Sequence, residues 1–123
     1  MYPPEQDEPD RRPIWDALQI FWLDTDANLD LRRVAEICER SKYSLSELEE
    51  IYWNEVRPAV RFNIFSLAGE WAGFDPEWLS KRILNVPRFG KALSRKVFHP
   101  YSGMWWDRLS SEINQVENER RHA

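Results

Sequence analysis

The chain has 123 residues, a formal net charge of −4 and a pI of about 5.2, with 42% apolar and 31% charged residues. Such a length favours one globular domain with a substantial core. The acidity disfavours a general polyanion-binding protein, whose domain pI typically exceeds about 9. Cys38 is the single cysteine, which excludes a disulfide framework and a cysteine-based zinc site. Neither a secretory signal nor an apolar run of the ~18 residues that a membrane span needs is visible, so we expect a cytoplasmic protein.

The first predicted helix follows an acidic segment. Residues 1–12 are rich in proline and acidic side chains, and we expect them to be disordered or draped over the domain. Pro13 suits the first turn of a helix. Apolar residues recur at helical spacing from there to about Leu23, on a wide stripe that predicts a helix buried along much of its girth.

The stretch 24–30, DTDANLD, separates this helix from a second one. Its acidic spacing resembles the start of a calcium loop, but Leu29 and Ala35 stand where such a loop requires glycine and glutamate. Asp30 can cap the next helix, which carries Cys38 on its apolar face. We therefore expect a turn between helices rather than a metal site, and a buried thiol rather than a nucleophile.

The segment SLSE contains the clearest local signal. Ser44 and Glu47 have the spacing of a capping box, in which each side chain accepts a hydrogen bond from the other residue's backbone amide. The helix that follows is predicted to kink or break near Pro58, because proline lacks the amide donor and its ring crowds the preceding turn. Glu49, Glu50, Asn54 and Glu55 make this helix acidic, and a solvated face is the default interpretation of them. The alternative, which the leading hypothesis adopts, is a partner-binding face formed by Glu47, Glu49 and Glu50 together with Asn54.

The stretch 69–75, GEWAGFD, is interpreted mainly as a joint between two helices, with Gly69 closing the first. The alternative is a site, in which Glu70 lies at the mouth of an aromatic pocket and binds a cation or a partner's basic side chain. Glu70 and Trp71 are therefore added to the predicted partner-binding residues. Pro76 then suits the first turn of the next helix.

Basic and aromatic side chains are interleaved over residues 88–106. This combination can bind single-stranded nucleic acid through phosphate contacts and base stacking. The candidate contacts are Arg88, Lys91, Arg95 and Lys96. An ordinary amphipathic helix with core aromatics is favoured over this alternative, because the chain as a whole is acidic.

These patterns predict an all-α fold, a compact single-domain bundle of five or six helices. The helical domain is expected to span residues 13–117, with residues 118–123 frayed at the C-terminus. No stretch alternates with the period of two that a half-buried strand requires.

Residues 52–84, from YWNEV to KRIL, resemble a family of short bacterial proteins without an established activity. The shared pattern is WNEV, here residues 53–56, followed by GEWAGF and an acidic residue, here residues 69–75. FWLDTD, residues 21–26, also looks like the leading helix of that family. The resemblance implies a bacterial, cytosolic, helical protein, and its small size and acidity are similar to those of immunity or antitoxin proteins.

The leading hypothesis is a non-enzymatic protein-binding module without a cofactor or a metal, whose acidic face meets a basic partner such as a nuclease-type toxin. The first alternative is nucleic-acid binding through the basic segment. The second is a small-ligand protein or an enzyme with a pocket at residues 69–75. No catalytic constellation of nucleophile and base is apparent in the sequence.

Overall fold

The computed structural model describes residues 1–23, 27–60, 76–85 and 100–122, and this part of the chain is built of helices without a strand. The predicted all-α fold is confirmed. The α-helices are α1 (Glu8–Leu18), α2 (Ile20–Leu23), α3 (Leu31–Arg40), α4 (Leu45–Ile51), α5 (Arg57–Val60), α7 (Pro76–Asn85) and α9 (Pro100–Arg121). Short 3-10 helices occupy Pro4–Gln6 (η1) and Ala27–Leu29 (η2), and a π-helical segment occupies Tyr52–Val56 (η3).

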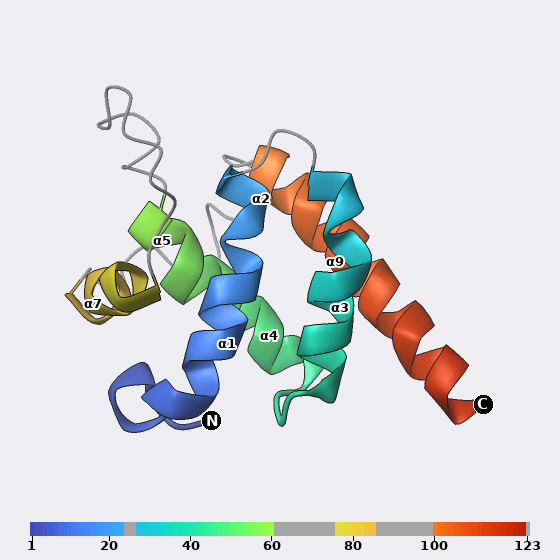
Figure 1. The fold of residues 1–123 in the computed structure, drawn as a ribbon, viewed down its shortest axis with the longest axis horizontal. Coiled ribbons are helices and arrows are strands. Elements are labelled where there is room, and N and C mark those ends of the chain that lie inside the picture. The colour runs from blue at the N-terminus through green and yellow to red at the C-terminus, as the bar shows by residue number, and fades with distance from the viewer. Residues whose placement is uncertain (24–26, 61–75, 86–99, 123) are drawn as a thin grey trace.

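Helix α1 lies at the centre of the described fold and contacts α3, α7 and η3 (Figure 1). The long helix α9 packs along α3, and α7 contacts both α1 and α5. Ion pairs tie α3 to α9 across their exposed sides: Arg32 lies 2.7 Å from Glu119, and Arg120 lies 2.7 Å from Glu39. The hydrogen bond from Arg32 is the main reason why the pKa of Glu119 is lowered.

Aromatic rings from three parts of the chain meet in the core. The ring centroid of Tyr52 in η3 lies 5.0 Å from that of Trp22 and 5.3 Å from that of Trp106. Phe21 and Trp105 stack at 5.1 Å. Because each such pair contributes about 0.5–1.5 kcal/mol beyond its buried area, the aromatic side chains hold α2, η3 and α9 together.

Helical structure extends further toward both ends of the chain than the sequence predicts. Residues 1–12 are expected to be disordered or draped, with a helix from Pro13, but α1 begins at Glu8 and Pro13 lies inside it. Arg11 explains this early helix start. Its buried side chain forms ion pairs with Asp7 and with Glu55, which is 44 residues away, and so holds the first turns of α1 against the fold. Fraying is expected from residue 118, whereas α9 continues to Arg121.

The irregularity predicted near Pro58 takes the form of a π-helical segment. The chain stays helical from α4 through η3 into α5, and the Arg57 amide donates to the Tyr52 carbonyl, five residues back. A proline at position 58 cannot donate to the carbonyl of residue 54, and its ring would crowd that carbonyl in a regular α-turn. The wider π-turn accommodates the ring without ending the helix.

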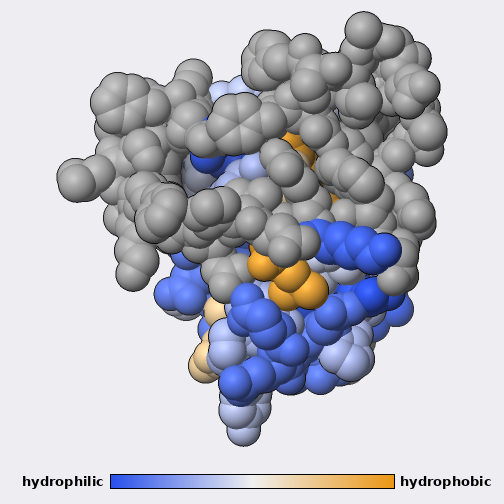
Figure 2. Space-filling model, turned by 90° about the vertical axis from the view of Figure 1, so that its left-hand side faces the viewer, coloured by the Kyte–Doolittle hydropathy of each residue, from blue (hydrophilic) through white to orange (hydrophobic). Residues whose placement is uncertain are grey.

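Figure 2 shows the side of the molecule on which α7 lies in Figure 1. The surface of the described residues on this side is largely hydrophilic, with a small hydrophobic area next to the residues drawn in grey. The joint at 69–75 and the basic residues from Arg88 to Lys96 lie outside the described residues.

Candidate functional site

A buried carboxylate, Glu55, connects η3 to α1. Its Oε2 accepts a hydrogen bond from Arg11 Nη2 at 2.9 Å, and its Oε1 accepts one from Trp15 Nε1 at 2.8 Å. The exposed fractions are 5% for Glu55, 1% for Arg11 and 1% for Trp15. A charge buried this deeply is tolerated only when it is paired and hydrogen-bonded, so this contact sets how α1 sits against η3.

Asp7 extends the ion pair toward the surface, where it meets the exposed Lys42. We call the set the buried ion cluster: Asp7, Arg11, Tyr43 and Glu55, which are buried, with Lys42 at its exposed end. Asp7 accepts hydrogen bonds from Arg11 at 3.0 Å, from Lys42 at 2.6 Å and from Tyr43 Oη at 2.5 Å. Burial alone would raise the pKa of Asp7, but the hydrogen bonds from Lys42 and Tyr43 and the neighbouring charges outweigh it and keep the pKa below its usual value.

Tyr43 stays protonated as the hydrogen-bond donor in this cluster. Its pKa is raised by burial and by its hydrogen bond to the Asp7 carboxylate. The Arg11 guanidinium also lies 5.5 Å from the centre of the Tyr43 ring, within the range of a cation–π contact. The cluster therefore ties α1 to the loop before α4 as well as to η3.

A hollow of about 420 Å³ lies next to this cluster, and we call it the N-terminal hollow. One wall is formed by residues 1–4. Arg11 from α1 and the three polar residues Glu50, Asn54 and Glu55 form the rest. The Tyr2 carbonyl accepts a hydrogen bond from Arg11 at 2.9 Å, which fixes residues 1–4 relative to α1.

The π-turn explains why Glu50, Asn54 and Glu55 line one hollow. In a regular α-helix of 3.6 residues per turn, positions 50 and 54 share a face and position 55 lies about 100° further round. In a π-turn a residue lies near the one five positions later, because the backbone hydrogen bonds join i to i+5. The wider turn through η3 thus brings Glu55 toward the face of Glu50 and Asn54.

Glu49 and Glu50 differ from the other acidic side chains that the structure describes. The side chain of Glu77 lies outside the part of the chain that the structure describes; every other carboxylate within residues 1–23, 27–60, 76–85 and 100–122, apart from Glu49 and Glu50, has a hydrogen bond, an ion pair or another electrostatic contact. Glu49 and Glu50 have none. Glu50 is exposed and Glu49 half-buried, so this acidic pair is free to meet a partner.

Glu47, a third acidic residue of the predicted face, has a structural role. The capping box at the start of α4 is present: Glu47 N donates to Ser44 Oγ at 3.1 Å, and Ser44 N donates to Glu47 Oε1 at 2.9 Å. The hydrogen bond from the Ser44 amide is the main cause of the lowered pKa of Glu47. Of the predicted face, Glu49, Glu50 and Asn54 thus remain as candidates, while Glu70 and Trp71 lie outside the described residues.

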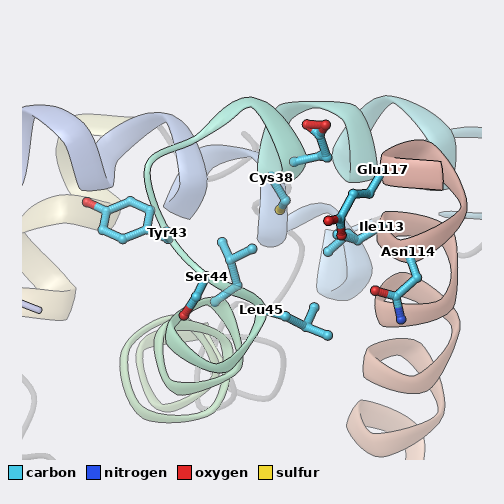
Figure 3. Close-up of a pocket in the computed structure, with 9 residues that line it drawn as sticks. Cys38, Tyr43, Ser44, Leu45, Ile113, Asn114 and Glu117 are labelled. Atoms are coloured by element: carbon cyan, nitrogen blue, oxygen red, sulfur yellow. The ribbon is translucent and has the colours of Figure 1, made fainter. Parts of the chain in front are cut away.

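A second hollow, of about 370 Å³, lies between α3, the start of α4 and α9. Figure 3 shows Cys38 reaching it from α3 and Ile113, Asn114 and Glu117 from α9. Its two carboxylates already have cationic partners, because Glu39 accepts hydrogen bonds from Arg120 and Glu117 accepts one from Arg121. This hollow is therefore less suited to a basic partner than the N-terminal hollow.

Cys38 is buried, as the sequence predicts, and burial raises the pKa of its thiol to about 12. The thiolate that nucleophilic chemistry requires is therefore scarce at neutral pH. In the described segments, histidine, cysteine and acidic side chains do not gather in threes around a possible metal position. Helices long and apolar enough to cross a membrane are likewise missing from the described part of the chain.

Sequence reasoning missed the acidic and basic residues of the buried ion cluster, of which Arg11 and Glu55 also line the N-terminal hollow. Arg11 and Asp7 fall in the segment expected to be disordered or draped, and Glu55 belongs to the helix whose acidic side chains are by default solvated. One available signal was the i, i+4 spacing of Asp7 and Arg11, which suits an ion pair on a helix. That spacing does not reveal burial.

These features define the class: an all-α protein in which a buried ion cluster lies beside a free acidic pair. The chain belongs to a family described as a domain of unknown function (DUF7079), whose model matches residues 9–119. The match covers almost the whole chain, and the expected membership of a family without an assigned activity is confirmed at this level. Comparison with curated proteins and with solved structures gives no match.

Proposed function

We propose that this protein is a non-enzymatic protein-binding module whose acidic pair, Glu49 and Glu50, meets a basic surface of its partner. The observation that carries the proposal is the lack of any partner for these two carboxylates among the described residues, where all other described acidic side chains are engaged. Because these two carboxylates form no ion pair within the described residues, no such pair has to be broken before a basic partner binds. Such charge complementarity raises association rates and selects the partner.

The surroundings of the buried thiol and of the buried carboxylates support the non-enzymatic part of the proposal. The thiol of Cys38 is buried and protonated at neutral pH. Asp7 and Glu55 are held by cations, so neither is poised as a general base. The ion pairs of these two carboxylates with Arg11 stabilise the fold.

One concrete version is an immunity-type protein that neutralises a basic bacterial toxin in the cytoplasm by direct binding. Its support is the small acidic chain and the free acidic pair, and the bacterial origin and location belong to the same proposal. If this version holds, the captured partner expressed alone arrests growth. Co-expression of the wild-type protein then restores growth, and the charge-reversed protein does not.

The test is partner capture with the affinity tag at the C-terminus, because the N-terminal residues line the hollow. The wild-type protein is compared with the double variant Glu49→Lys/Glu50→Lys. A matched control, Glu36→Lys/Glu117→Lys, changes the net charge by the same amount on α3 and α9, where it breaks only surface pairs worth about 0–1 kcal/mol each.

We expect the wild-type and control proteins to retain the same partner at low salt and to lose it at about 0.5 M salt, where charges are screened beyond about 4 Å. The Glu49→Lys/Glu50→Lys protein should not retain the partner at either salt concentration. Equal capture by the two double variants would exclude the acidic pair from the interface and refute the proposal.

A further inference from the structure

We infer that the N-terminal hollow receives a single arginine side chain of the protein partner, an inference that rests on the proposed function. The hollow measures about 420 Å³, near the lower end of the ~300–1,000 Å³ of small-molecule pockets. A space of this size accepts one long side chain, and Glu50 at its wall belongs to the free acidic pair.

The charge of the hollow favours a cation. Arg11, the one basic side chain that lines it, is neutralised by two carboxylates, Asp7 at 3.0 Å and Glu55 at 2.9 Å. Met1 also lines the hollow, and its terminal ammonium is paired as well, with Glu47 at 3.7 Å. Glu50 contributes a further negative charge that nothing in the described residues balances. An anion that entered the hollow would be repelled by Glu50 and would find no unpaired cation to bind among the described residues that line it. A cation that entered could form an ion pair with the Glu50 carboxylate.

The walls suit a side chain with a long apolar stem and a flat charged end. Residues 1–4 present an aromatic ring, two prolines and a methionine, and Tyr2 is 66% exposed. An arginine stem can pack along such apolar groups while its guanidinium stays at the polar end. The planar guanidinium can also stack on the Tyr2 ring and donate two parallel hydrogen bonds to the Glu50 carboxylate, which a lysine ammonium cannot do.

The geometry of the helix places the polar residues of the hollow on one face. Asn54 lies one turn after Glu50, and the π-turn adds Glu55 to the same face. Glu49, the other free carboxylate, does not line the hollow. The two members of the acidic pair therefore have separable roles: Glu49 attracts the partner from outside, and Glu50 holds the arginine.

The experiment uses the full chain and three short capped peptides, acetyl-Gly-Xaa-Gly-amide, in which Xaa is arginine, lysine or citrulline. Citrulline keeps the shape of arginine but carries no charge. Binding is followed by the movement of backbone amide NMR signals. We expect the arginine peptide to shift the signals of Glu50 and Asn54 and to bind roughly tenfold or more tightly than the citrulline peptide, because charge-assisted hydrogen bonds are lost with the charge. The lysine peptide should be several-fold weaker than the arginine peptide.

Two matched variants complete the design. Glu50→Gln should weaken arginine binding roughly tenfold, while Glu49→Gln, which removes the neighbouring charge outside the hollow, should weaken it less than about threefold. Equal binding of arginine and citrulline, no signal movement around residues 50–54, or equal effects of the two variants would each overturn the inference. The proposed function would survive any of these results if Glu49→Lys/Glu50→Lys still abolished partner capture.

Discussion

Glu50 and Glu55 lie five residues apart on one continuous helical segment, yet their surroundings are opposite. Glu55 is 5% exposed and accepts hydrogen bonds from Arg11 and Trp15 of α1. Glu50 is exposed and has no hydrogen bond or ion pair among the described residues. The first residue holds two helices together, whereas the second is available to another molecule.

The comparison shows how one acidic helix supports both stability and recognition. Removing a buried, paired charge leaves its partner unpaired in a region of low polarity, which costs far more than removing a charge that water already solvates. Substitutions in the buried ion cluster should therefore change the free energy of unfolding, while substitutions in the acidic pair should change binding alone. The following variants test that division, from the largest expected effect to the smallest.

Glu55→Ala should give the largest effect, because it leaves the Arg11 guanidinium and the Trp15 N–H buried without this acceptor. We expect the free energy of unfolding, measured by urea denaturation, to fall by about 3–5 kcal/mol. The matched variant Glu50→Ala should change it by less than about 0.5 kcal/mol. Similar losses in the two variants would contradict the division between the residues.

Asp7→Asn should lower stability by about 1–3 kcal/mol at neutral pH, since the carboxylate accepts hydrogen bonds from two cations and a tyrosine. The native pKa of Asp7 lies below its usual 3.8, so its stabilising contribution is present above about pH 4 and is lost as the pH falls through the native pKa. The difference between wild type and Asp7→Asn should therefore shrink as the pH falls below 4. A difference that stays constant down to about pH 2 would show that the ionised carboxylate is not its source.

Among the three destabilising variants, Ser44→Ala should have the smallest effect on stability. It removes the hydroxyl that accepts the Glu47 amide in the capping box, and the loss of such a cap costs about 1 kcal/mol. Thermal unfolding monitored by circular dichroism measures the change, with Ser46→Ala, an exposed serine inside α4, as the control. Equal midpoints for the two variants would show that the cap contributes no stability.

Several features follow from short stretches of sequence, because the forces behind them are local. The Ser44–Glu47 capping box joins residues three apart, and it forms as the sequence predicts. The inward position of Cys38 follows from helical periodicity, and the irregularity before Pro58 follows from the missing amide and the bulk of the ring. The all-α fold is the sum of such local signals.

The division of the acidic residues was decided only by the tertiary structure. The sequence places Glu49, Glu50 and Glu55 on one acidic helical segment, and nothing local distinguishes a carboxylate that will meet Arg11, 44 positions away, from one that stays free. The contact between Arg11 and Glu55 also lies in the early helical turn that begins at Glu8, which is why local sequence alone predicts the helix only from Pro13. Local propensity determines which segments are helical, but burial and charge pairing are properties of the assembled helices, because they depend on which side chains the fold brings together.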